Sequence, residues 1–159
     1  MKNTPCFMFT LFVCAVAHGQ APEPWALPDP MVLMESSNAL CADQVKSTLV
    51  VGALREQGRS KAEVLALLPQ SPKGMELRVV SAMRENVEDA FDFPEISVDS
   101  QFSYRSEACF RETLGGLRAP RLAALRSQVD KCQALHGAGK SQALFKCIEA
   151  VVRSAEPQR

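Results

Sequence analysis

Hydrophobic residues recur along most of this chain at spacings of three and four, which places them on one face of an α-helix. The first such stretch begins near Ser36 or Ser37, both suitable N-caps, and stops at Gly58. Its apolar positions repeat at every fourth residue: Cys41, Val45, Leu49 and Ala53. The pattern predicts one amphipathic helix across this stretch.

Two further helices are expected before residue 95. Ser60 and Glu63 form a capping box, which predicts a short helix that ends before Pro69. A third helix should run over about residues 75–91 and close at Pro94. The expected buried positions of these two helices are Val64, Leu65, Leu67, Leu68, Met75, Val79, Met83, Val87, Ala90 and Phe91.

Three more helices are expected after residue 98. Asp99 or Ser100 can cap the fourth, a pair of glycines ends it, and Pro120 suits the first turn of the fifth. The sixth follows a loop at residues 136–140. Their expected apolar faces are formed by Phe102, Cys109, Phe110 and Thr113, by Leu122, Leu125, Val129, Cys132 and Leu135, and by Leu144, Cys147, Ile148 and Val151.

The N-terminal residues have the pattern of a secretory signal peptide. Lys2 precedes an uncharged apolar run of 12 residues, from Cys6 to Ala17, and small residues follow it. Spanning a bilayer takes about 20 apolar residues, so we expect no permanent membrane anchor. Cleavage is expected after Gly19, with Ala17 as the alternative, and it predicts a periplasmic or secreted protein.

A proline-rich segment follows the expected cleavage site. Its four prolines are Pro22, Pro24, Pro28 and Pro30. Because proline disrupts a helix interior, we expect residues 20–35 to form an extended leader. The only tryptophan, Trp25, lies in this leader. We expect it to pack back onto the domain, with the anchoring of a partner as the alternative.

Cleavage would leave four cysteines, an even number that predicts two disulfides in an oxidising compartment. Cys132 and Cys147 are symmetric about position 139.5, which falls within the turn at residues 137–140. An antiparallel helical hairpin would therefore place them at the same height on facing apolar stripes, where they can bond. By elimination, Cys41 pairs with Cys109 and ties the first helix to the fourth.

The chain shows no run of alternating β-branched residues long enough to predict a strand. We therefore expect an all-α fold, a disulfide-stapled helical bundle of five to six helices that ends in a C-terminal helical hairpin. After the signal peptide (1–19) and the leader (20–35), we expect a helical core (36–116) and a disulfide-bonded hairpin (117–155) within one compact domain.

Residues 134–141, Ala-Leu-His-Gly-Ala-Gly-Lys-Ser, match a relaxed phosphate-loop pattern. A working phosphate loop follows a β-strand, whereas this segment follows an amphipathic helix, so we interpret it as the hairpin turn and expect no nucleotide binding. The four cysteines lie 68, 23 and 15 positions apart, and His136 is the one histidine outside the N-terminal segment. We therefore expect no metal site and no cofactor.

The charges cancel over the whole sequence, 18 basic against 18 acidic, so nothing suggests a nucleic-acid partner. They are unevenly distributed: residues 1–100 carry 8 basic and 13 acidic side chains, and residues 101–159 carry 10 and 5. We expect the two halves to attract each other within one monomer. The alternative is that the acidic stretch meets a basic partner, with Glu88, Asp89, Asp92 and Glu95 as candidate partner-binding residues.

The acidic stretch at residues 85–99 lacks the alternating ligands and central glycine of a calcium loop, so we interpret it as a solvated helix face. A Ser-His-Asp or Cys-His set would have to use His136, which lies in the expected turn with no nucleophile motif beside it. Paired carboxylates can hydrolyse glycosides, but a small helical bundle offers no evident cleft for them. We expect no catalytic residues and a protein that is not an enzyme.

The expected function is that of an interaction module that binds another protein, as an inhibitor or immunity-type protein. An export signal followed by a helical domain, with Cys41 in the first helix and Cys109 in a later one, is similar to the small periplasmic immunity proteins that neutralise amidases delivered by type VI secretion. The hairpin Cys132-Gln-Ala-Leu…Phe-Lys-Cys147-Ile resembles the helical pairs of small exported lysozyme-inhibitor-like proteins of bacteria. Both resemblances imply a binding protein.

The alternative function is that of a helical carrier for a lipid or another apolar ligand. This hypothesis rests on the supply of large flexible and aromatic side chains in the third and fourth helices: Met75, Met83, Phe91, Phe102 and Phe110. Such residues more often form an ordinary core. The surroundings of these Met and Phe side chains decide between a ligand-binding cavity and an ordinary core. Helical periodicity does not reveal those surroundings.

Overall fold

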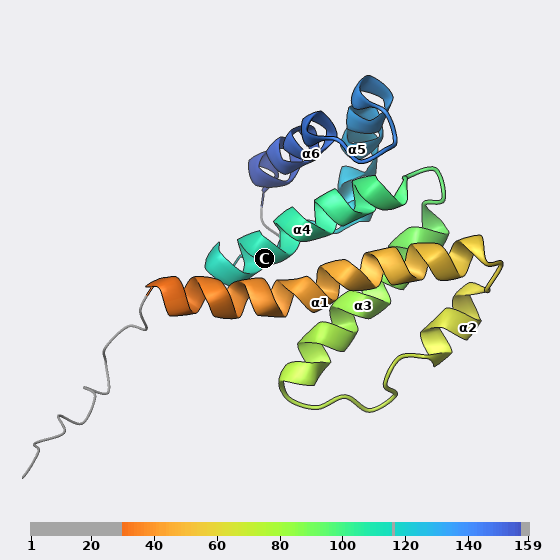
Figure 1. Cartoon of the computed structure of the whole chain (residues 1–159), viewed down its shortest axis with the longest axis vertical. Coiled ribbons are helices and arrows are strands. Elements are labelled where there is room, and N and C mark those ends of the chain that lie inside the picture. The colour runs from red at the N-terminus through yellow and green to blue at the C-terminus, as the bar shows by residue number, and fades with distance from the viewer. Residues whose placement is uncertain (1–29, 116, 157–159) are drawn as a thin grey trace, which may run out of the picture.

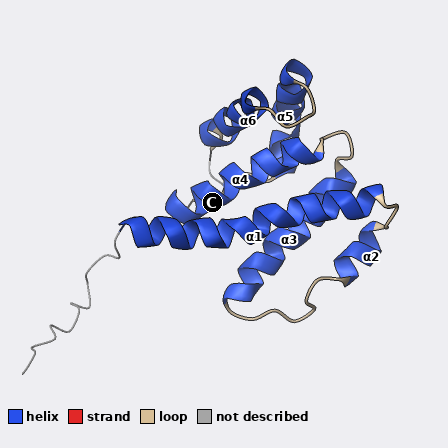
Figure 2. Ribbon diagram, in the orientation of Figure 1, coloured by secondary structure: helices blue, strands red, loops and turns tan. Residues whose placement is uncertain are grey.

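The structure, a computed structural model, describes residues 30–115 and 117–156 (Figure 1). Within these ranges it contains six α-helices and no β-strand, which confirms the all-α prediction (Figure 2). The helices are α1 (Pro30–Glu56), α2 (Lys61–Ala66), α3 (Met75–Asp92), α4 (Val98–Gly115), α5 (Leu122–His136) and α6 (Gln142–Ser154). None of these helices is both long and apolar enough to cross a membrane.

The first helix begins at Pro30, earlier than the predicted start near Ser36 or Ser37. It therefore takes in part of the segment 20–35 that was interpreted as extended. Proline is tolerated in the first turn of a helix, where its missing N–H would have no intrahelical partner. The predicted signal peptide and Trp25 lie outside the described residues.

Serine side chains cap two of the helices, and the capping box at Ser60 and Glu63 was predicted. At α2 the Glu63 N–H donates to the Ser60 hydroxyl (3.3 Å), and the Ser60 N–H donates to the Glu63 carboxylate (2.8 Å), which completes the capping box. At α6 the Leu144 N–H donates to the hydroxyl of Ser141 (3.1 Å). These caps are local, so they could be identified without knowledge of the tertiary fold.

Two helices cross the middle of the molecule, and the others cover them from opposite sides. Figure 1 shows α1 and α4 next to each other, with α5 and α6 beyond α4, and with α3 and α2 beyond α1. The larger core lies between α4, α5 and α6 and contains Tyr104, Ala108, Leu122, Leu125, Val129, Leu144, Ile148 and Val152. The smaller one lies between α1, α2 and α3 and contains Val51, Val64, Val87 and Ala90.

A glycine allows α1 and α4 to approach each other closely. A Cβ atom at Gly52 would lie 2.5 Å from Cγ2 of Val98, at the start of α4. A larger residue would force the Val98 side chain or its helix to shift, because real Cβ atoms essentially never approach so closely. The contact sets the spacing between the two halves of the molecule.

The predicted buried face of α1 was partly wrong. Leu49 is 43% exposed and Ala53 is exposed, while Val45, Thr48 and Gly52 are buried. A repeat of four residues drifts by about 40° per step on a helix with 3.6 residues per turn. A strict four-residue series therefore leaves the buried face after two steps, and the alternating three-four series stays on it.

The predicted face of α4 was also partly wrong, although Cys109 is buried as expected. Phe110 is exposed and Phe102 is only partly buried, whereas Gln101, Arg105 and Glu107 are buried. α4 packs against α1, α3, α5 and α6, so it is enclosed on most of its circumference and shows no single apolar stripe. Polar side chains then enter the interior and need partners there.

Two exposed leucines depart from the predicted faces of α2 and α5. Leu67 is 70% exposed directly after α2, and Leu135 is 74% exposed in the last turn of α5. The other predicted positions of α5 are buried: Leu122, Leu125, Val129 and Cys132. The periodicity therefore identified the helical face, and it extended that face beyond the region that the neighbouring helix covers.

Both predicted disulfides are confirmed. Cys132 in α5 bonds to Cys147 in α6, and Cys41 in α1 bonds to Cys109 in α4, each with a Cα–Cα distance of 5.7 Å. The first closes a local hairpin, and the second joins residues 68 positions apart. Cys41–Cys109 is thus a disulfide cross-link between the half of the molecule that contains α1–α3 and the half that contains α4–α6, in addition to the backbone between α3 and α4.

Candidate functional site

A cleft lined by charged side chains opens beside the Cys41–Cys109 disulfide. Its volume is about 670 Å³, and it lies among α1, α3, α4 and the segment that leads into α5. The residues that line it are Gln44, Leu77, Arg78, Val79, Ser81, Ala82, Glu85, Arg105, Cys109, Glu112, Thr113 and Arg118. We refer to it below as the charged cleft.

Arg105 forms part of the buried wall of this cleft. Its side chain is only 5% exposed. Its Nη1 donates to Glu85 Oε2 and its Nη2 donates to Asp89 Oδ2, both at 3.2 Å. A buried guanidinium is tolerated when carboxylates neutralise it, and removing either side of such a pair leaves an uncompensated charge. The wall is therefore held together by ion pairs between α3 and α4.

Glu85 is shared by three arginines from different parts of the sequence. Its carboxylate lies 3.2 Å from Arg105, 2.6 Å from Arg118 and 3.4 Å from Arg121. Arg121, the N-cap residue of α5, also pairs with Glu88 at 2.9 Å. One carboxylate on α3 thus fixes the relative positions of α4 and of the segment that opens α5.

Burial also changes the acidity of Asp89. It raises the pKa of Asp89 to about 6, against the opposing attraction of Arg105 and Arg121 and with a smaller contribution from the negative charges of Glu85 and Glu88. A carboxylate in the interior is costly even when a guanidinium accompanies it. Asp89 therefore takes up a proton at a pH well above that of an ordinary aspartate.

Glu112 also lines the cleft, two turns after Arg105 on α4. Its Oε1 accepts a hydrogen bond from the backbone N–H of Ala119 at 3.3 Å. Burial raises the pKa of Glu112, while this hydrogen bond and the nearby Arg105 oppose the rise. The carboxylate is held beside the segment that carries Arg118, so both charges face the same space.

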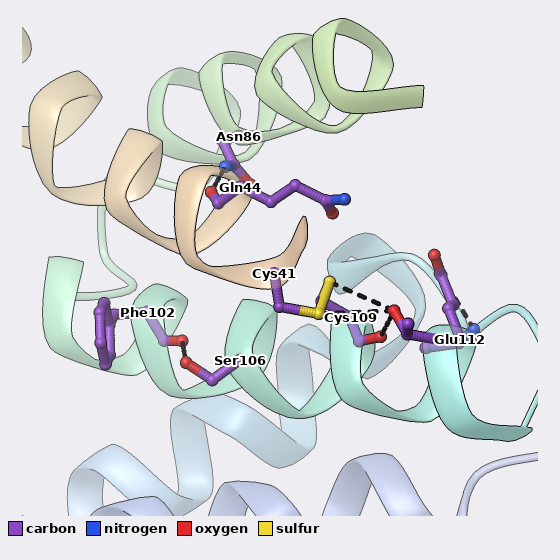
Figure 3. Close-up of a disulfide and its surroundings, with 9 residues drawn as sticks. Cys41, Gln44, Asn86, Phe102, Ser106, Cys109 and Glu112 are labelled. Atoms are coloured by element: carbon purple, nitrogen blue, oxygen red, sulfur yellow. Dashed lines mark hydrogen bonds between the residues drawn. A yellow bond between two sulfur atoms is a disulfide. The ribbon is translucent and has the colours of Figure 1, made fainter. Parts of the chain in front are cut away.

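Hydrogen bonds to α1 fix the remaining wall. Asn86 donates from its Nδ2 to the carbonyl of Gln44 at 2.7 Å and to the hydroxyl of Ser47 at 2.6 Å. The Thr113 hydroxyl donates to the carbonyl of Cys109 at 2.8 Å. Figure 3 shows Gln44 projecting from α1 one turn after Cys41, and Glu112 one turn after Cys109. The cleft is thus bordered by two helices that a disulfide connects.

The four sequence-predicted carboxylates all pair with cations of the same molecule. Their partners are Arg121 for Glu88, Arg105 for Asp89, Lys61 for Asp92 and Arg126 for Glu95. Three of these pairs join the acidic half of the sequence to the basic half, as expected, whereas Lys61 itself belongs to the acidic half. A role of these carboxylates in partner binding stays a prediction. The side chain of Asp89 is 5% exposed, so only the other three are on the surface.

Sequence reasoning missed most of the cleft residues. Arg105, Glu112 and Gln44 were assigned no role, because an isolated arginine, glutamate or glutamine on a helix usually points to solvent. The available signal was the charge imbalance between the two halves, which indicated that acidic and basic side chains meet somewhere. It did not indicate that they enclose a cavity.

The groups that the cleft presents are charged and polar side chains. In the part of the protein that the structure describes, no group of three His, Cys, Asp or Glu side chains is arranged to hold a metal ion. His136 ends α5 and does not line the cleft. The side chains that do line it offer guanidinium and amide donors and carboxylate acceptors, which recognise charged and polar groups.

A second cavity lies on the other side of α1 and has the opposite character. This apolar groove, of about 330 Å³, lies between α1, α2 and α3. Its lining residues are Asp43, Lys46, Ser47, Val50, Val51, Leu54, Val64, Leu67, Leu68, Met83 and Val87. Of the side chains considered for an apolar carrier, Met83 lines it; Phe91 packs against the small core, and Phe110 is exposed on α4.

No protein-family model matches this sequence, and no curated protein or solved structure was found to be similar to it.

Proposed function

We propose that this protein is an exported, non-enzymatic interaction module that binds another protein through the charged cleft. The observation that carries the proposal is the fixed arrangement of charge in the cleft wall, where Arg105 is held between Glu85 and Asp89. A binding site whose charged groups are already positioned loses less entropy when it binds. Complementary charge then supplies specificity and fast association.

The state of Glu85 favours a structural role over catalysis. A general base needs a lone pair that is free to accept a proton from substrate. Glu85 is occupied by three guanidiniums. Glu112 accepts the Ala119 N–H through Oε1 only, and this hydrogen bond helps to hold the cleft in shape.

Export supplies the conditions for the two disulfides. Disulfides form and persist in oxidising compartments such as the bacterial periplasm or the extracellular medium. Cys41–Cys109 and Cys132–Cys147 agree with the prediction of a signal peptide that ends at Gly19 or Ala17. Intact-mass measurement of the protein from a periplasmic extract tests this. We expect a polypeptide that begins at residue 20 or 18 and has no free thiol; an uncleaved or reduced form would contradict export.

The test of partner binding uses two matched arginines on α3. Arg78 lines the cleft, whereas Arg84 is exposed on the same helix and does not line it. We expect the wild type and Arg84→Glu to retain one stoichiometric protein partner from periplasmic extract or culture medium, and Arg78→Glu to lose it. If all three proteins retain the partner equally, or if none retains any, the proposal of binding through the cleft is wrong.

The apolar groove supports a second candidate function, that of a carrier for an apolar ligand. Val50 and Leu67 border the groove and are 59% and 70% exposed, so apolar surface is accessible there. Native mass spectrometry of the purified protein should then show a bound lipid or other apolar molecule. Val50→Asp should abolish the adduct, and Leu135→Asp, an exposed position outside the groove, should leave it in place.

A further inference from the structure

The residues that line the charged cleft carry an excess of positive charge. Three guanidiniums, of Arg78, Arg105 and Arg118, face the cavity together with the two carboxylates of Glu85 and Glu112. Arg105 is neutralised within the wall by Glu85 and by Asp89, which does not line the cavity. The two arginines nearer the solvent, Arg78 and Arg118, therefore determine what the open part of the cleft attracts.

Arg118 has donors to spare. Its side chain is 57% exposed, and it uses Nη2 to contact Glu85 Oε1 at 2.6 Å. That carboxylate is already shared with Arg105 and Arg121. Among the side chains that the structure describes, Arg118 forms no other hydrogen bond or ion pair, and Arg78 forms no ion pair. A guanidinium with free donors forms its strongest contacts with a carboxylate or a phosphate.

An unsatisfied buried donor lies in the same wall. Arg105 Nε is fully buried and has no hydrogen-bond partner within the described ranges. Its positive charge is not matched by an acceptor at that atom, and such a buried donor is energetically costly. The cleft wall thus retains one buried donor without an acceptor after the internal ion pairs have formed.

Glu112 limits how much negative charge the cleft accepts. It lines the cavity, and its Oε2 has no partner within the described ranges. A dianion such as phosphate would be repelled by it more strongly than a singly charged carboxylate. Gln44, on the α1 side, adds an amide that can donate to a ligand oxygen or accept from a ligand N–H.

We propose that the charged cleft binds a carboxylate of a polypeptide, with Arg78 and Arg118 as the contacting cations and with Glu112 selecting against phosphate. This inference rests on the proposed function, since it names the group of the partner that the cleft receives. The carboxylate belongs either to an acidic side chain or to the C-terminal residue of the polypeptide, and both present the same two oxygens to a guanidinium.

Peptide binding followed by NMR tests the inference without knowledge of the partner. The probes are acetyl-Ala-Glu-Ala-amide, acetyl-Ala-Ala-Ala with a free C-terminus, the neutral acetyl-Ala-Gln-Ala-amide, and inorganic phosphate, all at constant ionic strength. We expect at least one carboxylate peptide to shift the Nε–Hε resonances of Arg78 and Arg118 to saturation, and the neutral peptide to shift neither. The responding peptide identifies the source of the carboxylate.

Matched variants should change the affinity for the carboxylate peptide by different amounts. Arg78→Gln and Arg118→Gln should each weaken the binding of the carboxylate peptide about tenfold, and Arg84→Gln should leave it unchanged. Glu112→Gln should make phosphate bind more tightly. The melting temperature of each variant shows whether the fold is retained. Because Arg78 has no ion pair among the described residues, its variant tests the cleft even if Arg118→Gln unfolds the protein.

Two results would overturn the inference: saturation by neither carboxylate peptide, or phosphate binding as tight as peptide binding in the wild type. Its failure is distinguishable from that of the proposed function. If Arg78→Glu still loses a protein partner while the peptides do not bind, the cleft binds a partner through another group. If the peptides bind and no protein partner is retained, the cleft takes a carboxylate that is not presented by a protein partner.

Discussion

The charged cleft and the apolar groove share α1 and α3 but depend on different parts of the molecule. The cleft needs both halves, because α4 and the segment before α5 supply Arg105, Glu112 and Arg118. The groove is built entirely from α1, α2 and α3. A change in the contacts between the halves should therefore alter the cleft and spare the groove. The comparison separates the two proposed functions experimentally.

The largest decrease in the free energy of unfolding is expected from removing the buried guanidinium of Arg105. Arg105→Met would leave Asp89 and Glu85 without their shared partner, and breaking a buried pair costs about 3–5 kcal/mol. Urea unfolding at pH 7 measures the loss. Arg126→Met is the control, because its pair with Glu95 is solvent-exposed, and we expect it to cost about 0–1 kcal/mol. Equal losses would mean that the buried cluster does not hold the halves together.

Removing each of the two disulfides should lower the free energy of unfolding by a different amount. Only one of the two removals should affect the charged cleft. On the chain-entropy model, replacing Cys41 and Cys109 by serine costs about 4 kcal/mol, and replacing Cys132 and Cys147 costs about 3 kcal/mol. Denaturant unfolding measures both.

The first disulfide borders the cleft, so its loss should weaken carboxylate binding, while the loss of the hairpin disulfide should not. Neither double variant should change the binding of an apolar dye to the groove. A loss of dye binding on removal of Cys41–Cys109 would show that the groove also depends on the contacts between the halves.

Protonation of Asp89 is expected to change the free energy of unfolding by a smaller amount. Its pKa is raised from 3.8 to about 6, so the folded protein binds a proton more readily than the unfolded protein between these values. This contribution to the free energy of unfolding is therefore lowest above pH 6 and rises as the pH falls. Between pH 7 and pH 5 we expect a gain of about 1 kcal/mol.

Urea unfolding of the wild type and of Asp89→Asn at both pH values isolates this contribution. The variant has no carboxyl group to protonate at position 89, so it should lack the gain, and the difference between the two proteins cancels the titration of other groups. The same pH dependence in both proteins would mean that Asp89 titrates normally.

The smallest effect on stability is expected at the apolar groove. Val50 is 59% exposed, so Val50→Asp should change the free energy of unfolding by about 0.5 kcal/mol or less. It should nevertheless reduce the binding of an apolar dye, because it places a charge on the lining of the groove. Carboxylate binding in the cleft should be unaffected. Weaker peptide binding by this variant would show that the two cavities are coupled through α1.

Features that depend on nearby residues were predictable from the sequence. The capping box at Ser60 and Glu63 needs only a four-residue pattern, and the hairpin disulfide follows from two cysteines placed symmetrically about a short turn. Cys41–Cys109 followed by elimination, because only two other cysteines remained. Helical periodicity located all six helices, although it placed the start of α1 too late.

The charged cleft was not predictable, because it depends on which helices surround α4. Arg105 and Glu112 lie seven residues apart on one helix and carry no pattern that distinguishes them from solvent-exposed residues. Arg105 is buried because α3 brings Glu85 and Asp89 against it, and that contact is tertiary. Charge counts along the sequence indicated attraction between the halves, without indicating which side chains would become buried.

The sharing of Glu85 among three arginines has a consequence for ligand binding. A carboxylate that draws Arg118 away from Glu85 leaves the Glu85 oxygens to Arg105 and Arg121 alone, which strengthens the bonds that connect α3 to α4 and to the start of α5. Binding at the mouth of the cleft and cohesion of the helices behind it are then thermodynamically linked, and such linkage is reciprocal. A mutation that tightens the helix packing around Glu85 should therefore also raise the affinity for the ligand.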